Sequence, residues 1–337
     1  MASTPSTASA PSSSSPHAAV ATSSASATAP VTRAFFSGAV AGMVADSMLH
    51  PIDTINLRMK VQTQQTAEYS GILRSAMTIV RNEGIRGCFG GISTTMMASP
   101  VCASIYFGSY ETIKSLALPH VSENNAGVVY FLSGACSEAI ISTISVPAEV
   151  IKCRLQLGRN PHLASGGAIR HTKNYKGTIH ALGSILRSEG IRGLYTGYAA
   201  CLSVDTFFSA FSFLFYETMK HGYRQYVAAR EQHERSLTAA ESLVLGSLAG
   251  GCSAFITNPL DVMTVRIMTQ GKEKRYHGLA DCFMKTVGQE GVGALWKGAS
   301  CRMTAIMPQM GICFGVYETI KRYFFEGELE EFDFDDL

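Results

Sequence analysis

This chain of 337 residues has little charge, a single tryptophan and no paired cysteine motif. Charged residues make up 16% of it, against roughly 25% in soluble domains, which is too little for a soluble surface of this size. Its nine cysteines include no Cys-x-x-Cys pair, so neither a disulfide framework nor a zinc site is indicated. A phosphate loop, a nucleophile elbow and a His-Glu-x-x-His motif are also missing. An enzyme therefore has little support, and neither a cofactor nor a nucleic-acid partner is expected.

Long uninterrupted hydrophobic runs are scarce too. Few segments reach 18 apolar residues without a polar interruption, as expected for membrane helices with one face on lipid and one on a polar interior. The net charge of +2 is unevenly spread, because the stretches 56–91, 150–197 and 264–298 hold 19 of the 28 Lys and Arg but only 6 of the 26 Asp and Glu. Basic loops set membrane orientation, so we expect these three loops on one inner side.

The composition of both ends of the chain predicts tails outside the folded part. Residues 1–31 are rich in Ser, Thr, Ala and Pro, and the first 30 contain no Lys or Arg. They do not resemble an Arg-rich targeting presequence, and we expect a disordered, exposed tail. Residues 326–337 carry seven acidic residues and are expected to form a second, solvated tail.

What the chain does contain is one pattern written three times, about a hundred residues apart. Such repeats decide the fold. Each copy has a long apolar segment ending in a Pro-x-acid motif, a short amphipathic segment suited to a membrane surface, an acid-Gly turn leading to an aromatic-x-Gly motif, and a returning apolar segment ending in Tyr-Glu-x-x-Lys. The Pro-x-acid motifs are Pro51 to Arg58, Pro147 to Arg154 and Pro259 to Arg266. We expect three two-helix repeats at residues 32–118, 126–223 and 238–325, with both termini on the outer side.

These nine motifs in register resemble the mitochondrial carrier family over roughly residues 32–325. The resemblance implies an all-α membrane protein with six transmembrane helices in three pseudosymmetric two-helix repeats and short surface helices on the matrix side. It further implies a monomer in the inner mitochondrial membrane, with both termini facing the intermembrane space. The partners would be the lipid bilayer, with cardiolipin at the matrix side, and a small solute moved by alternating access.

The Tyr-Glu-x-x-Lys motifs predict a gate on the cytoplasmic side. Acid and base three residues apart lie on one helix face and can meet a partner on the next repeat, although local pairs within each helix are the alternative. The predicted cytoplasmic gate is Glu111, Lys114, Glu217, Lys220, Glu318 and Lys321.

The matrix gate looks weakened. Its predicted members are Asp53, Asn56, Glu149, Lys152, Asp261 and Thr264. The family usually has a base where this chain has Asn56 and Thr264. By the family's pairing rule the one intact bridge joins Asp53 to Lys152, while Glu149 would face Thr264 and Asp261 would face Asn56. The arginines two residues further along, Arg58, Arg154 and Arg266, could partly substitute, and a weak gate would favour the inward-open state.

Intramembrane acids are functional candidates by default, and three stand out. Asp46 lies two helical turns before Asp53 on the same face, Glu138 lies eleven residues before Glu149 on nearly the same face, and Asp205 lies on the fourth helix. A low-dielectric cavity with these carboxylates favours a positive solute, and Arg302 is a further predicted substrate-binding residue. The alternative is that the acids only hydrate the pathway or pair with Arg302.

These acids also resemble those of S-adenosylmethionine carriers, in which Ala98 and Ile306 would occupy the other contact positions. Val204 departs from that pattern, because those carriers usually have an arginine there to bind an α-carboxylate. Ala305 departs too, since an aromatic residue is expected nearby.

Two alternatives remain open. Transition-metal transport is suggested by soft donors near the contact level and by a loose likeness to iron-transporting mitoferrins, although methionines more often serve packing. The residues of this alternative site are Met96, Met97, Cys102, Met307, Met310 and His50. A carrier-fold scaffold that no longer transports is the other alternative.

Overall fold

The computed structural model describes residues 16–62, 69, 71–121, 126–157, 175–231, 238–271 and 274–325, and every regular element within these ranges is helical. The acidic tail, the first 15 residues and loop residues 158–174 lie outside the described part. Our expectations for those segments therefore stay expectations.

Each repeat has the same order of elements. The leading long helices are α1 (Pro16–Val61), α4 (Ala126–Gln156) and α9 (Ala239–Thr269). The short helices are α2 (Ile72–Glu83), α6 (Thr178–Glu189) and α10 (Leu279–Glu290). The turns are the 3₁₀ helix η2 (Ile85–Phe89), α7 (Ile191–Leu194) and the 3₁₀ helix η5 (Val292–Trp296). The returning helices are α3 (Ile92–Ala117), which is followed by η3 (Leu118–His120), α8 (Tyr198–Glu231) and α11 (Ala299–Phe325).

Helix α1 begins at Pro16, well before the predicted start near Thr32. Part of the segment expected to be a disordered tail is therefore drawn as helix. Residues 16–29 contain six alanines, which favour helix because alanine is the strongest helix former, and proline is tolerated in the first turn.

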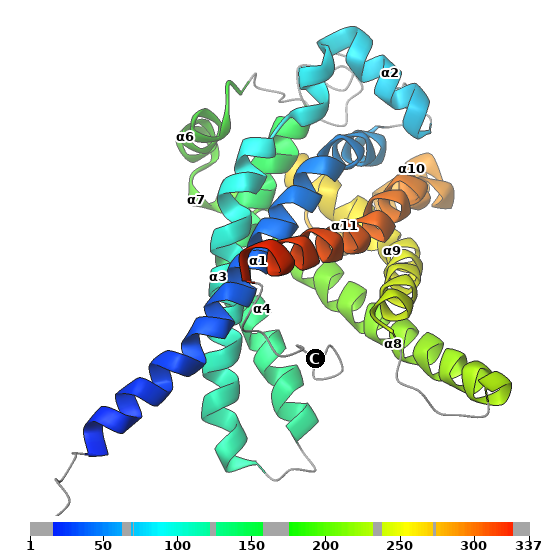
Figure 1. Cartoon of the computed structure of the whole chain (residues 1–337). Coiled ribbons are helices and arrows are strands. Elements are labelled where there is room, and N and C mark those ends of the chain that lie inside the picture. The colour runs from blue at the N-terminus through cyan, green and yellow to red at the C-terminus, as the bar shows by residue number, and fades with distance from the viewer. Residues whose placement is uncertain are drawn as a thin grey trace, which may run out of the picture.

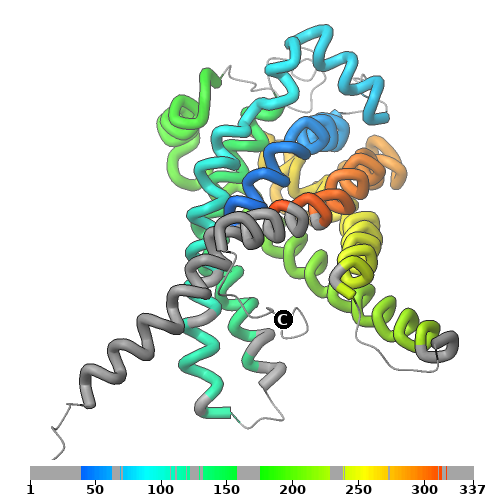
Figure 2. Tube along the Cα trace, viewed as in Figure 1, coloured from blue at the N-terminus to red at the C-terminus, as the bar shows by residue number. Residues whose placement is uncertain are grey.

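The repeats close into a ring through their neighbours. Helix α3 packs on α4, α8 packs on α9, and α11 packs on α1, and each of these three pairs joins two different repeats. Figures 1 and 2 show α3 beside α4 and α8 beside α9, with the short helices α2, α6 and α10 around one end of the molecule. The third repeat thus contacts the first, as threefold pseudosymmetry requires.

The largest buried core lies at the end of the molecule that carries the short helices. It joins Ile55 of α1, Val150 of α4 and Val265 of α9 with Ile79 of α2. Figure 1 shows the long helices spreading apart away from this end. The three Pro-x-acid motifs therefore meet where the bundle is best packed.

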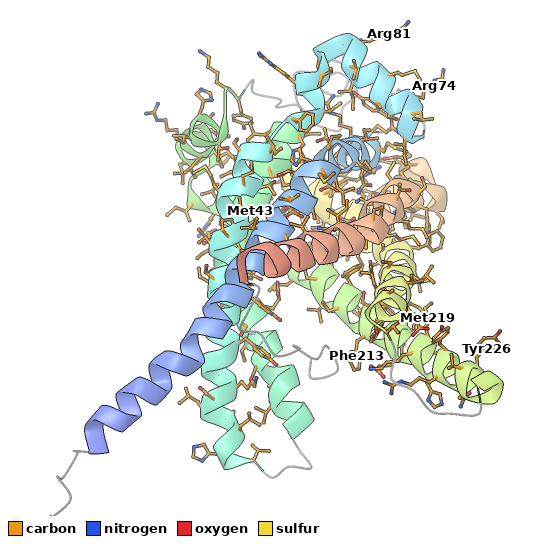
Figure 3. The ribbon with its side chains drawn as sticks, in the orientation of Figure 1. Met43, Arg74, Arg81, Phe213, Met219 and Tyr226 are labelled. Carbon is orange, nitrogen blue, oxygen red and sulfur yellow. The ribbon has the colours of Figure 1, made fainter. Side chains whose placement is uncertain are left out.

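The outer surface suits lipid. Phe213 and Tyr226 on α8 are 68% and 58% exposed and point outward (Figure 3). Within the described residues, four helices are long and apolar enough to cross a membrane, at Ile85–Ala117, Leu132–Gln156, Ile191–Val227 and Ala240–Thr269. Arg74 and Arg81 project from α2 into the surroundings, as expected of a surface helix with basic flanks.

Candidate functional site

The three arginines of the Pro-x-acid motifs do not fill the matrix gate as suggested from sequence. Each makes a bidentate pair with the acidic residue of the acid-Gly turn in its own repeat, the strongest geometry for such a pair. Arg58 binds Glu83 at 2.6 and 2.9 Å, and the pairs Arg154–Glu189 and Arg266–Glu290 repeat this arrangement. The fork geometry uses up the guanidinium, so these arginines are unavailable to the gate carboxylates.

The same arginines tie each repeat to the next one. The Nε of Arg58 donates to the Gln156 carbonyl at 2.9 Å, that of Arg154 to the Met268 carbonyl at 3.3 Å, and that of Arg266 to the Lys60 carbonyl at 3.0 Å. The first repeat thus binds the second, the second the third, and the third the first. These bonds to helix-end carbonyls close the ring.

Glycine of the aromatic-x-Gly motif makes the close approach possible. Gly91, Gly197 and Gly298 have φ of 82°, 86° and 80°, a left-handed conformation that suits glycine. A Cβ on Gly298 would lie 2.6 Å from Asn56 Oδ1 of the next repeat. Only a residue without a side chain fits this contact.

One predicted gate pair forms across repeats. Lys152 Nζ lies 4.0 Å from Asp53 Oδ2 and 3.8 Å from Glu149 Oε2 on its own helix. Thr264 does not turn toward Glu149, because its hydroxyl donates to the Leu260 carbonyl at 2.9 Å. Among the described residues, Glu149 therefore has no ion pair with the third repeat.

The expected pairing of Asp261 with Asn56 does not form among the described residues. Asp261 pairs instead with Lys60 of α1, one turn beyond Asn56, and with Arg302 of α11, whose Nε lies 3.1 Å from Asp261 Oδ2. Asn56 Oδ1 is buried and accepts no hydrogen bond from the described residues. A lysine side chain is long enough to bridge a one-turn displacement. The matrix gate therefore has two ion pairs between repeats, Asp53–Lys152 and Asp261–Lys60, and not one.

The cytoplasmic gate is only partly described. Lys114 Nζ lies 5.6 Å from the Tyr110 ring centre, and Lys220 Nζ lies 5.6 Å from that of Tyr216, which fits cation–π contacts. The side chains of Glu111, Glu318 and Lys321 lie outside the described part of the structure. The ring of ion pairs there stays a prediction.

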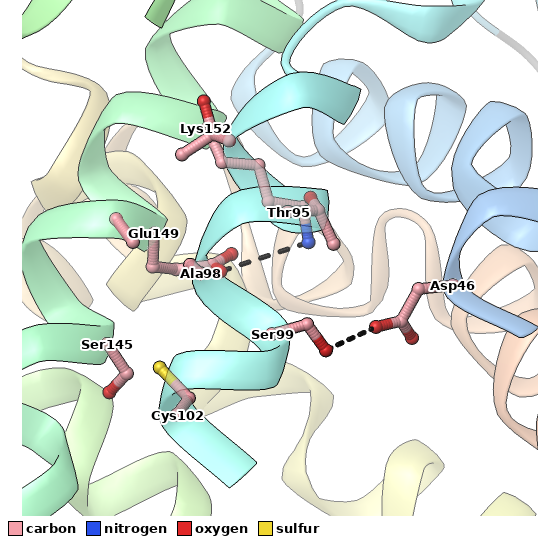
Figure 4. A pocket seen from close by; sticks show the side chains of 10 residues that line it. Asp46, Thr95, Ala98, Ser99, Cys102, Ser145, Glu149 and Lys152 are labelled. Carbon is pink, nitrogen blue, oxygen red and sulfur yellow. Dashed lines mark hydrogen bonds and ion pairs between the residues drawn. The ribbon is translucent and has the colours of Figure 1, made fainter. Parts of the chain in front are cut away.

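A cavity of about 200 Å³ lies between α1, α3 and α4. Figure 4 shows Asp46 and Ser99 pointing toward one another, with Glu149 and Lys152 approaching from α4. The full lining is Asp46, Thr94, Thr95, Ala98, Ser99, Cys102, Ser145, Ala148, Glu149 and Lys152. The cavity thus brings two predicted contact residues, Asp46 and Ala98, together with two predicted gate residues.

Asp46 is held by donors that the sequence did not point to. Gln309 Nε2 of α11 donates to Asp46 Oδ1 at 2.9 Å, and Ser99 Oγ of α3 donates to Oδ2 at a long 3.5 Å. Gln309 directly follows Pro308 in a helix interior. An amide in a membrane segment was the available signal, but no repeated motif contains it.

The other predicted contact residues are not among those lining this cavity. Asp205 accepts a bond from Cys201 Sγ at 3.6 Å on its own helix, while Glu138 is half-buried. Ile306 packs against Gly250, where an added Cβ would lie 3.2 Å from Ile306 Cγ2. Arg302, which the sequence predicts as a further substrate-binding residue, pairs with Asp261 in this structure.

The soft donors of the metal alternative do not gather. His50 is buried and its Nε2 donates to the Gly90 carbonyl at 2.9 Å. Met307 packs against Gly251, Met96 and Met97 are exposed, and the Met310 side chain lies outside the described part. The described residues contain no group of three or more His, Cys, Asp or Glu that could hold a metal ion.

Glu290, at the end of the surface helix α10, is bound by two basic side chains, Arg266 and Lys297. Burial raises its pKa, but hydrogen bonds from Arg266 and from Lys297, whose Nζ lies 2.7 Å away, outweigh burial and leave the pKa below its ordinary value. The carboxylate is thus ionised at neutral pH and stabilises the link between α9 and α10.

Comparison with known proteins agrees with this architecture. The family model described as mitochondrial carrier protein matches three times, at residues 27–120, 124–227 and 235–328. S-adenosylmethionine carrier 1, chloroplastic/mitochondrial, from Arabidopsis thaliana is 32% identical over 86% of this chain and 78% of its own length. Mitochondrial substrate carrier family protein E from Dictyostelium discoideum is 30% identical over 85% and 94%.

Solute carrier family 25 member 45 from Homo sapiens is 30% identical over 86% of this chain and 98% of its own length. The three matches of the family model together cover most of the chain. They coincide with the three-part ring of helices and with the repeated arginine–glutamate links. The protein belongs to the mitochondrial carrier family, and is a multi-pass membrane transporter of small solutes rather than an enzyme.

Proposed function

We propose that this carrier moves a cationic or amino-acid-like solute, with S-adenosylmethionine the best single candidate, across the mitochondrial inner membrane by alternating access. The observation that carries the proposal is the Asp46 carboxylate in the cavity between α1, α3 and α4. The relative named S-adenosylmethionine carrier 1 supports the choice of solute.

The cavity combines charges of both signs. Asp46 and Glu149 are acidic, Lys152 is basic, and Ser99 and Ser145 add hydroxyls. An amino-acid-like cation presents an amine or sulfonium to carboxylates and a carboxylate to an amine. Because charged groups in a low-dielectric cleft concentrate solutes of complementary charge, this lining favours such a molecule over an anion.

The remaining site assignments belong to the same proposal. Six transmembrane helices in three repeats would enclose the pathway, with both termini toward the intermembrane space. Glu138 and Asp205 would line it further out, with Ala98 and Ile306 as uncharged contacts. The predicted cytoplasmic-gate residues would close the opposite end, and cardiolipin would bind on the matrix side of the monomer.

Uptake of labelled S-adenosylmethionine into proteoliposomes tests the proposal. We expect Asp46→Asn to lower the rate at least about tenfold, since a charge-assisted contact contributes about 1.5–3 kcal/mol. Asp281→Asn is the matched control, because Asp281 is an acid on the surface helix α10, paired with Lys285 at 2.8 Å. That variant should transport like the wild type.

Other outcomes would point elsewhere. Uptake of Fe(II) or Mn(II) but not of S-adenosylmethionine would replace the proposed solute with a metal. An absence of flux for every solute of a broad panel would favour the scaffold. Equal uptake by Asp46→Asn and wild type would remove Asp46 from the site.

A further inference from the structure

Asp261 at the matrix gate has two basic partners that come from different repeats. Lys60 reaches it from α1 of the first repeat, and Arg302 reaches it from α11 of its own, third repeat. Asn56 stands where the family would have a base. Among the described residues, it makes no hydrogen bond with Asp261. The ion pair between the third and first repeats therefore exists, with its base displaced along the helix.

We infer that Lys60 is the gate base at this interface and replaces the base that the family has at the position of Asn56. It acts as a positioning residue, because it holds α1 against α9 and does not touch the solute. Residues four apart lie on the same face of a helix, one turn of about 5.4 Å apart. A lysine side chain can span that distance. This inference rests on the proposed alternating access but not on the identity of the solute.

Burial makes the pair a condition for closure. The Lys60 side chain is 3% exposed and that of Asp261 is 17% exposed. An ammonium buried without a partner is costly, because it has lost its water and gained nothing in return. The matrix ends of α1 and α9 can therefore pack this closely only while Lys60 meets Asp261.

Because Arg302 also binds Asp261, opening of the matrix gate affects Lys60 and Asp261 differently. It belongs to the same repeat as Asp261 and is itself held by Thr257 Oγ1 at 3.1 Å and by the Phe208 ring at 5.5 Å. When α1 moves away, Asp261 keeps Arg302, whereas Lys60 must find water. The gate then opens without leaving a bare carboxylate.

The test uses Cys102, which lines the cavity, as the single cysteine left in the chain. Its modification by a membrane-impermeant maleimide from the matrix side measures how often the matrix gate is open. We expect Lys60→Gln to raise this rate about tenfold, which corresponds to the loss of one net ion pair. Lys60→Arg should stay within about twofold of the parent, because it keeps the positive charge that attracts Asp261.

Moving the base back is the decisive variant. Asn56→Lys combined with Lys60→Gln should restore the slow modification, since the amine returns to the position one turn earlier. A merely structural role of Lys60 predicts no such rescue. If Lys60→Gln alone does not fold, recovery of folding and slow modification in the double variant supports the inference equally.

Modification as slow in Lys60→Gln as in the parent would overturn it, and so would a double variant no better than Lys60→Gln. The readout needs no substrate. Failure of S-adenosylmethionine uptake with the expected Cys102 pattern would therefore count against the proposed solute and leave Lys60 as the gate base.

Discussion

Adding a base at Thr264 should strengthen the one matrix-gate interface that has no ion pair between repeats among the described residues. Glu149 is 42% exposed and its basic neighbour, Lys152, comes from its own helix. By the threefold relation that would place Lys152 opposite Asp53, we expect residue 264 to lie opposite Glu149. We predict that Thr264→Lys shifts the carrier toward the matrix-closed state.

The size of the shift follows from charges at known separation. Lys152 and Asp53 are 4.0 Å apart, and two unit charges at about that distance attract by about 4 kcal/mol at an effective dielectric constant near 20. Desolvation of the new ammonium removes much of this gain, which leaves about 1–2 kcal/mol, within the usual coupling range. Since about 1.4 kcal/mol changes a ratio tenfold, the open population should fall about tenfold.

The assay is the matrix-side modification rate of Cys102 as the single cysteine. Thr264→Met is the matched control, because it has similar length and no charge, and it should leave the rate nearly unchanged. Adding Glu149→Gln to Thr264→Lys should cancel the effect. Asn56→Lys alone should do little, since Asp261 already has two bases.

Equal slowing by lysine and methionine at position 264 would refute the reasoning, because packing and not charge would then be responsible. Slowing by Thr264→Lys that persists without the Glu149 carboxylate would refute the assigned partner. A rise in the rate would mean that desolvation exceeds the attraction.

Two further predictions concern the links that close the ring. Glu290→Gln should lower the melting temperature of the detergent-solubilised protein at neutral pH. The pKa of Glu290 is lowered in the folded state. The stability that its carboxylate contributes is therefore present above the ordinary pKa of 4.5 and is lost as pH falls through the lowered value. The stability difference between wild type and variant should therefore shrink below about pH 4, and a difference that stays constant into acid would contradict it. Gly298→Ala should destabilise the protein more than Gly291→Ala. Both glycines have φ near 80°, so both variants share a backbone cost of about 1–2 kcal/mol. Only Gly298→Ala also places a Cβ 2.6 Å from Asn56 Oδ1. Equal melting temperatures for the two variants would argue against that close contact.

The repeated motifs predicted most of the fold because each signal is local. Proline, acid and base at fixed spacing in α1, α4 and α9 mark the same helix end three times, and positive φ at Gly91, Gly197 and Gly298 matches the turns. The start of α1 was misplaced, because composition favoured a tail where alanines favour helix. The arginines at those helix ends were recognised as possible substitutes for the missing gate bases, but they bind the glutamates of the acid-Gly turns.

The sequence by itself determined that this protein is a three-repeat carrier with acids inside its membrane helices, because spacing along one helix decides which residues share a face. The tertiary structure decided which side chains meet across helices. It joined Gln309 to Asp46 and Lys60, not Asn56, to Asp261. The reason is that long side chains reach more than one turn, so the distance between packed helices selects the partner, and no motif within one helix encodes that distance.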